Sequence, residues 1–204
     1  CRQYLPVRGK EPDTVYGDTF HRVAEDVPNS PVSTHIVILL EEFVQQGFIL
    51  AAELNINPDC FGFLGTSAGA HLAAVAAMTV PGTKAFVGYS GIYNLEKAAI
   101  TMKTKDPQRI AYFCDREPKV LREASPINLI PKKDVPASML VCGTCDVTVE
   151  CEQSEMFASA LKKRGGVCDL LKYEYYDHNV SSKTSDKMEE IFFKSVDFLT
   201  NHIK

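Results

Sequence analysis

Short runs of apolar residues alternate along the chain with segments whose apolar positions follow helical spacing. Continuous apolar runs of the kind found in buried strands lie at residues 60–64, 85–89, 138–142 and 168–175. Helices are predicted at residues 67–78 and 152–164 and from about residue 185 to the end of the chain, with short helical pieces at 108–114 and 118–123. Strands that alternate with helices predict an α/β fold, in which helices cover both faces of a mainly parallel sheet.

The first part of the chain has a different character. Residues 1–30 are polar and show no regular period, which predicts an irregular N-terminal segment. Ser30 and Pro31 suit the cap and the first position of a helix that extends to about residue 55. With 204 residues, 45% of them hydrophobic, the chain suits a single globular domain over residues 1–204.

Charge and hydropathy narrow the classes of partner. The chain has 22 Lys and Arg against 26 Asp and Glu, a net charge of −4, so it lacks the basic excess that favours binding to nucleic acid. Its apolar stretches, such as residues 67–80, are shorter than the roughly 18 residues needed to span a bilayer. We therefore predict no nucleic-acid partner and no membrane span, and the sequence indicates no oligomeric state.

The cysteines bear on the cellular compartment. Seven are scattered along the chain, and a disulfide scaffold is typical of much smaller secreted proteins. A reducing, cytoplasmic location is therefore predicted. The chain opens with Cys1, Arg2 and Gln3, and with neither Met nor an apolar signal region. We expect the natural N-terminus to lie upstream of Cys1.

Residues 65–69 read Gly-Thr-Ser-Ala-Gly and lie between a predicted strand and a predicted helix. A G-x-S-x-G sequence in that context is typical of a nucleophile elbow, in which glycines flank the serine because a Cβ there would clash. The start of the helix also stabilises negative charge that develops beside the serine. The alternative is a glycine-rich turn whose serine only caps the helix, but the context favours Ser67 as a nucleophile.

A serine nucleophile of this type needs an acid and then a histidine later in the chain. Asp146 follows the predicted strand at 138–142, and His178 follows the one at 168–175. The loops after parallel strands meet at one edge of a sheet, so both side chains are expected near Ser67. The alternatives are an ordinary turn aspartate and an ordinary surface-loop histidine.

Other titratable residues suit these two roles less well. Asp177 is adjacent to His178 and is poorly placed to orient its ring. Of the remaining histidines, two precede the serine, one lies a helical turn after it and one lies in the last helix: His21, His35, His71 and His202. We expect His71 to pack or to form a hydrogen bond rather than to react.

The chemistry of these residues is that of an activated serine. Ser67 would attack a carbonyl carbon, and His178 would take its proton and return it to the leaving group. Asp146 would orient the imidazole and stabilise its charged form, and the backbone N–H of Ala68 would donate to the oxyanion. No metal or organic cofactor is needed for this chemistry.

Four segments carry a resemblance to a known superfamily. Residues 65–74 resemble the elbow of α/β-hydrolase serine esterases in the hormone-sensitive-lipase-like and feruloyl-esterase-like branches, and arylformamidases and prenylcysteine methylesterases are similar there. Residues 89–95, 124–127 and 143–149 resemble the segment after the next strand, the Ser-Pro motif and the acid loop of the same enzymes.

The resemblance covers roughly residues 22–200 and implies the α/β-hydrolase fold, with Ser67, Asp146 and His178 as a catalytic triad. It implies a serine hydrolase that cleaves a small-molecule carboxylic ester, or an aryl or alkyl amide, through an acyl-enzyme. The irregular segment at residues 92–130 lies where such hydrolases often insert a lid over the substrate pocket.

One departure from the family pattern concerns the oxyanion hole. These enzymes carry an upstream His-Gly-Gly loop that supplies a second oxyanion donor, and no such motif occurs in this sequence. The early strands and that loop are therefore expected upstream of Cys1, and the alternative is that residues 2–19 substitute for them. The alternative function is a catalytically impaired hydrolase-like protein that serves binding.

A second departure is Cys142, which replaces the histidine usual at that point of the acid loop. With Cys145 it forms a Cys-x-x-Cys sequence, for which a redox dithiol is the alternative interpretation. Thioredoxin-type motifs, however, open a helix early in their fold. A metal site would need a second such pair or paired histidines, so we expect incidental cysteines and no metal.

Overall fold

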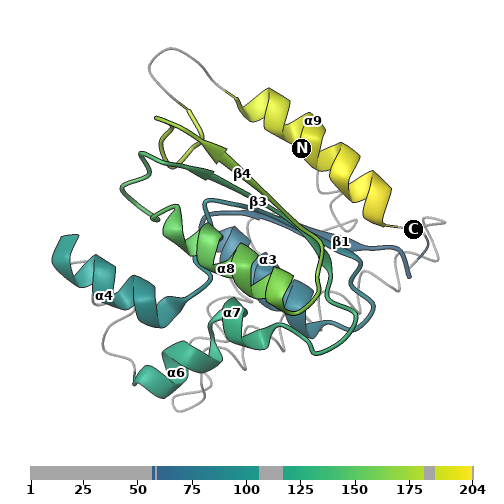
Figure 1. Ribbon diagram of the computed structural model, residues 1–204, viewed down its shortest axis with the longest axis horizontal. Helices are drawn as coiled ribbons and strands as arrows, with labels where there is room; N and C mark the ends of the chain where they lie inside the picture. Colours follow the sequence, from purple (N-terminus) through teal and green to yellow (C-terminus); the bar gives the residue numbers. More distant parts are fainter. Residues whose placement is uncertain (1–56, 58, 106–116, 182–186, 204) are drawn as a thin grey trace, which may run out of the picture.

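The computed structural model describes residues 57, 59–105, 117–181 and 187–203. Its strands form one sheet in the order β1-β2-β3-β4, and every neighbouring pair is parallel (Figure 1). The strands are β1 (Gly62–Thr66), β2 (Ala85–Tyr89), β3 (Ala137–Gly143) and β4 (Cys168–Tyr173). The helices are α3 (Ala68–Thr79), α4 (Leu95–Lys105), α6 (Pro118–Glu123), α7 (Pro126–Leu129), α8 (Glu152–Lys163) and α9 (Met188–His202). The predicted α/β architecture is confirmed.

Each predicted strand is present, and the differences lie at the strand ends. β2 has the predicted bounds, and β3 extends one residue beyond the predicted run at each end. β1 begins and ends two residues later than predicted. β4 stops two residues early, at Tyr173, because the chain turns and Tyr175 adopts a φ of 68°. A residue in that left-handed region does not continue a strand.

The helices predicted at residues 67–78, 118–123 and 152–164 are confirmed as α3, α6 and α8. Two further helices, α4 and α7, lie in the segment that was expected to be irregular. The side chain of Asn94 caps α4, because its Oδ1 accepts a hydrogen bond from the Lys97 N–H at 3.0 Å. α7 begins at Pro126, a residue suited to the first helical position. Both signals are local. The helices themselves were not predicted, because the apolar positions in this segment are too few and too irregular to show a helical period.

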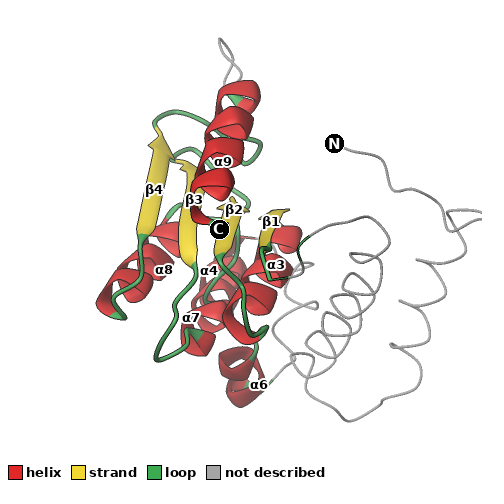
Figure 2. Cartoon of the chain, turned by 90° about the vertical axis from the view of Figure 1, so that its right-hand side faces the viewer, coloured by secondary structure: helices red, strands yellow, loops and turns green. Residues whose placement is uncertain are grey.

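Helices cover both faces of the sheet (Figures 1 and 2). On one face, side chains from α3, α7 and α8 form a core with Phe86 of β2 and Leu140 of β3. On the other face, α9 packs Ile191 against Val87 and Val141. Since successive strand residues point to opposite faces, β2 and β3 are buried on both sides. Their continuous apolar runs follow from this arrangement.

Several predictions concern residues outside the described ranges. They include the irregular segment at 1–30, the helix up to about residue 55 and a helical piece at 108–114. The prediction of a single domain, and that of a lid at residues 92–130, stay predictions. Within the described residues, no helix is both long enough and apolar enough to cross a membrane.

Candidate active site

The candidate residues lie where the strands end. Ser67 directly follows β1 and Ser90 directly follows β2, whereas Asp146 and His178 lie on the loops after β3 and β4. Because all four strands run in the same direction, these loops meet at the carboxyl edge of the sheet.

Ser67 occupies the sharp turn between β1 and α3. Its φ of 54° and ψ of −121° are unfavourable for a residue that carries a Cβ. Its N–H donates to the carbonyl oxygen of Tyr89 at 2.8 Å, which holds the turn against the end of β2. The Ser67 hydroxyl makes no capping hydrogen bond to α3, so this residue is not an ordinary capping serine.

Gly65 and Gly69, on either side of Ser67, differ in the space that they leave for a Cβ. A Cβ on Gly65 would overlap the carbonyl oxygen of Gly69, because β1 and α3 approach closely there. A Cβ on Gly69 would meet no described atom within 4 Å. The expected clash is therefore confirmed for Gly65 and, in the described part of the chain, wrong for Gly69.

The imidazole of His178 connects Ser67 to Asp146. Nε2 of the ring lies 2.9 Å from Oγ of Ser67, and Nδ1 lies 2.6 Å from Oδ2 of Asp146. These contacts join residues that are 111 and 32 positions apart in the sequence. The structure thus brings together the three side chains that the order of the sequence singled out.

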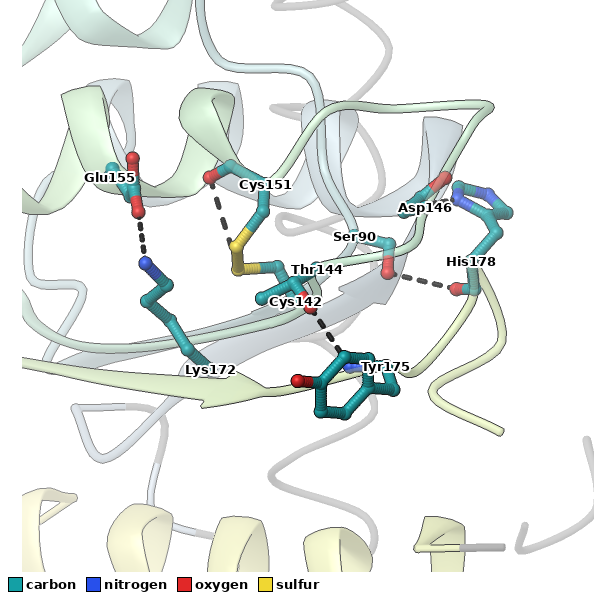
Figure 3. The surroundings of a disulfide bond; sticks show 9 residues. All are labelled: Ser90, Cys142, Thr144, Asp146, Cys151, Glu155, Lys172, Tyr175 and His178. Carbon is teal, nitrogen blue, oxygen red and sulfur yellow. Dashed lines mark hydrogen bonds and ion pairs between the residues drawn. A yellow bond between two sulfur atoms is a disulfide. The ribbon is translucent and has the colours of Figure 1, made fainter. Parts of the chain in front are cut away.

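The Asp146 carboxylate is fully buried and held from two sides. Its Oδ1 accepts hydrogen bonds from the backbone N–H groups of Thr148 and Val149, both at 2.8 Å. Its Oδ2 faces His178, whose side chain is 20% exposed (Figure 3). A carboxylate fixed in this way presents one oxygen to the imidazole in a defined direction, and the partly exposed ring stays within reach of solvent and substrate.

Asp177 has other partners. Its Oδ1 accepts hydrogen bonds from the backbone N–H groups of Asn179 and Ser181, and both of its oxygens accept from the Ser181 hydroxyl. Hydrogen bonds from Ser181 lower the pKa of the Asp177 carboxyl below its ordinary value, despite an opposing contribution from desolvation. This carboxylate shapes the loop around His178, in line with the expectation that it does not orient the ring.

Ala68 is the first residue of α3 and is exposed. The N–H groups of a first helical turn have no acceptor within the helix, which leaves the Ala68 N–H available as a donor, and its role at the oxyanion stays a prediction. The N–H of Ser67 itself is already donated to Tyr89. The expected second oxyanion donor concerns sequence upstream of Cys1 and stays a prediction.

Two polar contacts near the site were not singled out by the sequence. The Ser90 hydroxyl donates to the carbonyl oxygen of His178 at 2.8 Å (Figure 3). Nδ1 of His71 donates to the carbonyl oxygen of Ile92 at 3.0 Å, and burial lowers the pKa of this imidazole. The expectation of a hydrogen-bonding role for His71 is confirmed. The Ser-Gly pair directly after a buried strand was the available signal for Ser90.

The cysteines of the acid loop are paired differently from what their spacing suggested. Cys142 at the end of β3 forms a disulfide with Cys151 before α8, with 5.3 Å between their Cα atoms (Figure 3). Cys145 is free and exposed, so the Cys-x-x-Cys residues are not bonded to each other. The expectation that Cys142 is incidental is wrong, whereas the cytoplasmic location stays a prediction. No group of three or more His, Cys, Asp or Glu suited to a metal occurs among the described residues.

The profile of the prolyl oligopeptidase family matches residues 13–204, which is most of the chain and includes all of the site. This chain belongs to the prolyl oligopeptidase family. The sequence motifs had suggested an α/β-hydrolase without singling out this family.

Curated relatives of this prolyl oligopeptidase family member include esterases. The chain is 30% identical over 143 residues to the probable isoprenylcysteine alpha-carbonyl methylesterase of Oryza sativa subsp. japonica, over 60% of this chain and 34% of the relative. It is also 30% identical over 132 residues to esterase LipQ of Mycobacterium tuberculosis, over 56% of this chain and 31% of that protein. The matches span about a third of the length of these relatives.

Solved structures agree on the fold. The esterase Est2 of Thermogutta terrifontis, with butyrate bound, has a TM-score of 0.64 and 23% identity, over 85% of this chain and 67% of that chain. The acylaminoacyl peptidase of Pyrococcus horikoshii has a TM-score of 0.64 and 20% identity, over 81% of this chain and 27% of that chain. The described residues of this family member form part of an α/β-hydrolase fold.

Proposed function

We propose that the protein is a serine hydrolase that cleaves a small carboxylic ester through a Ser67–His178–Asp146 triad and an acyl-enzyme. The observation that carries the proposal is the pair of contacts made by one imidazole, 2.9 Å to the Ser67 hydroxyl and 2.6 Å to the Asp146 carboxylate. A nucleophile, a base and a group that orients the base form the arrangement that activates a serine.

The reaction follows from the direction of these contacts. Nε2 of His178 accepts the Ser67 proton as Oγ attacks the carbonyl carbon of the ester, and Nδ1–H donates to Asp146 throughout. The protonated imidazole then gives the proton to the leaving alcohol, and an acyl-enzyme remains. Water attacks this ester in turn, with His178 again as base, and releases the acid and free Ser67.

The start of α3 supports the charge that develops in this step. The tetrahedral intermediate carries a negative oxygen, and the Ala68 N–H lies at a helix N-terminus, where backbone dipoles favour negative charge. The φ of 54° at Ser67 is the strained backbone expected for the serine of a nucleophile elbow. A second donor would complete the oxyanion hole.

The relatives suggest the class of substrate. Two of them are named as esterases, one of them acting on an isoprenylcysteine methyl ester according to its name. We infer that this chain acts on a small-molecule carboxylic ester, with an aryl or alkyl amide as the neighbouring class.

Labelling with a fluorophosphonate probe tests the proposal. The probe forms a covalent bond with an activated serine, so the purified chain is expected to label, whereas Ser67→Ala and His178→Ala are expected not to. His202→Ala is a matched control, because His202 stacks on Phe198 in α9 and bonds the Phe198 carbonyl, away from the site. Labelling that persists in Ser67→Ala would contradict the assignment of the nucleophile. A folded chain that does not label, even with the upstream sequence restored, would favour the hydrolase-like binding protein.

A further inference from the structure

We propose that Ser90 is a positioning residue for His178, which keeps the imidazole within hydrogen-bond distance of Ser67. The inference rests on the proposed function, because positioning affects turnover only if His178 acts as the base. The Ser90 hydroxyl bonds the backbone carbonyl of His178, so Ser90 would act through the backbone of the histidine loop.

The first support is the contact itself. The Ser90 side chain is buried, with 1% of the residue exposed, and its hydroxyl donates to the carbonyl oxygen of His178 at 2.8 Å. The two residues are 88 positions apart, so the contact is purely tertiary. The bond is partly buried, so water competes less for the carbonyl oxygen, and the bond restrains the peptide from which the imidazole projects (Figure 3).

The second support is the backbone of Ser90. Its φ of 48° lies in the left-handed region, where glycine is the residue that is free of steric cost. A residue with a Cβ therefore needs a compensating interaction to occupy this position. The hydroxyl supplies it, because it forms the bond to His178 that a glycine could not form.

The third support is the place of Ser90 in the sheet. Its N–H donates to the carbonyl oxygen of Val141 at 2.8 Å, which fixes Ser90 between β2 and β3. The preceding residue, Tyr89, accepts the N–H of Ser67 at 2.8 Å. Two successive residues at the end of β2 therefore hold the nucleophile and the base. The 2.9 Å separation between Oγ of Ser67 and Nε2 of His178 depends on both anchors.

Two substitutions separate the hydroxyl from the backbone conformation. Ser90→Ala removes the hydroxyl and keeps the Cβ, whereas Ser90→Gly removes the hydroxyl and also relieves the unfavourable φ. If Ser90 only stabilised the turn, Ser90→Gly would keep the wild-type kcat. If its hydroxyl positions His178, both variants lose turnover.

Ser138→Ala is the matched control. Ser138 is also completely buried, and its hydroxyl donates to a backbone carbonyl, that of Pro136, at 3.0 Å. It lies near the amino end of β3, away from the carboxyl edge where the site lies. This variant loses the same kind of hydrogen bond without touching the histidine loop.

The experiment measures kcat and KM with p-nitrophenyl acetate, together with thermal unfolding. We expect kcat to fall about 10- to 100-fold in Ser90→Ala and Ser90→Gly with little change in KM, because misplaced catalytic groups slow the chemical step. Ser138→Ala is expected to keep the wild-type kcat, although it loses about as much thermal stability as Ser90→Ala. A Ser90→Gly variant with wild-type kcat would overturn the inference.

A proton NMR measurement distinguishes failure of this inference from failure of the proposed function. The proton between His178 Nδ1 and Asp146, 2.6 Å apart, is expected to give a resonance shifted far downfield, whether or not the chain hydrolyses p-nitrophenyl acetate. We expect faster exchange with solvent or loss of this signal in Ser90→Gly, and no change in Ser138→Ala. A wild-type chain without esterase activity would contradict the proposed function. An unchanged signal in Ser90→Gly would overturn the positioning role in either case.

Discussion

Nδ1 of His178 lies 2.6 Å from Oδ2 of Asp146, although the neighbouring carboxylate of Asp177 is adjacent to His178 in the sequence. Asp177, the nearer residue in the chain, is engaged with Ser181, and Asp146, the farther one, contacts the ring. The contact is made possible by the parallel pairing of β3 and β4, which places the two following loops side by side.

This relationship predicts that Asp146→Asn loses far more activity than Asp177→Asn. An asparagine at 146 can present its NH₂ group to the ring and favour the wrong tautomer, so kcat on p-nitrophenyl acetate is expected to fall by about 10³- to 10⁴-fold. Asp177→Asn keeps an acceptor oxygen for its loop and is expected to lose less than about 10-fold. Steady-state kinetics of both variants provide the measurement. Equal losses would contradict the assignment of Asp146 as the acid.

The close approach of β1 and α3 predicts opposite outcomes at the two glycines of the elbow. Gly65→Ala is expected to lower the free energy of unfolding by about 3 kcal/mol, because the new Cβ would overlap the Gly69 carbonyl. Gly69→Ala is expected to leave it unchanged or to raise it by up to about 1 kcal/mol, since alanine favours a helix. Urea unfolding of both variants tests this. A tolerated Gly65→Ala would show that the turn can open.

The disulfide between Cys142 and Cys151 closes a ring around the loop that carries Asp146. A ring with a sequence separation of 9 stabilises the folded chain by about 2–3 kcal/mol in the chain-entropy account, so a dithiol reductant is expected to lower Tm by about 5–10 °C. Cys142→Ala/Cys151→Ala is expected not to respond to reductant, whereas Cys145→Ser should respond like the wild type. Peptide mass spectrometry that finds Cys142 and Cys151 as free thiols under oxidising conditions would contradict the pairing.

The partly buried imidazole of His71 predicts a loss of stability in mild acid. Burial lowers the pKa of this imidazole in the folded chain. Below about pH 6.5 the imidazole is therefore protonated in the unfolded chain while it stays neutral in the folded chain. The resulting penalty is absent above that pH and grows as the pH falls toward the folded pKa. Urea unfolding between pH 7.5 and about pH 5 is expected to show a steeper decline for the wild type than for His71→Gln. Parallel pH profiles would indicate that His71 does not titrate differently on folding.

The sequence determined the four strands, the helices α3, α6 and α8, and the identities of the three candidate residues. The apolar runs at β2 and β3 are long and uninterrupted because both faces of these strands are buried, and such a pattern is visible in one dimension. The G-x-S-x-G between a strand and a helix marked Ser67, and the order of the chain then marked Asp146 and His178. These signals are local, or they depend only on order along the chain.

Only the tertiary structure decided which groups touch. The parallel pairing of β3 and β4 sets their following loops side by side. His178 therefore contacts Asp146 rather than Asp177. The bond from Ser90 to His178 links residues that no local pattern connects. The same holds for the partner of Cys142, which lies beyond the loop rather than three residues away. Contacts of this kind depend on how the loops converge at the sheet edge, a property that composition and periodicity do not encode.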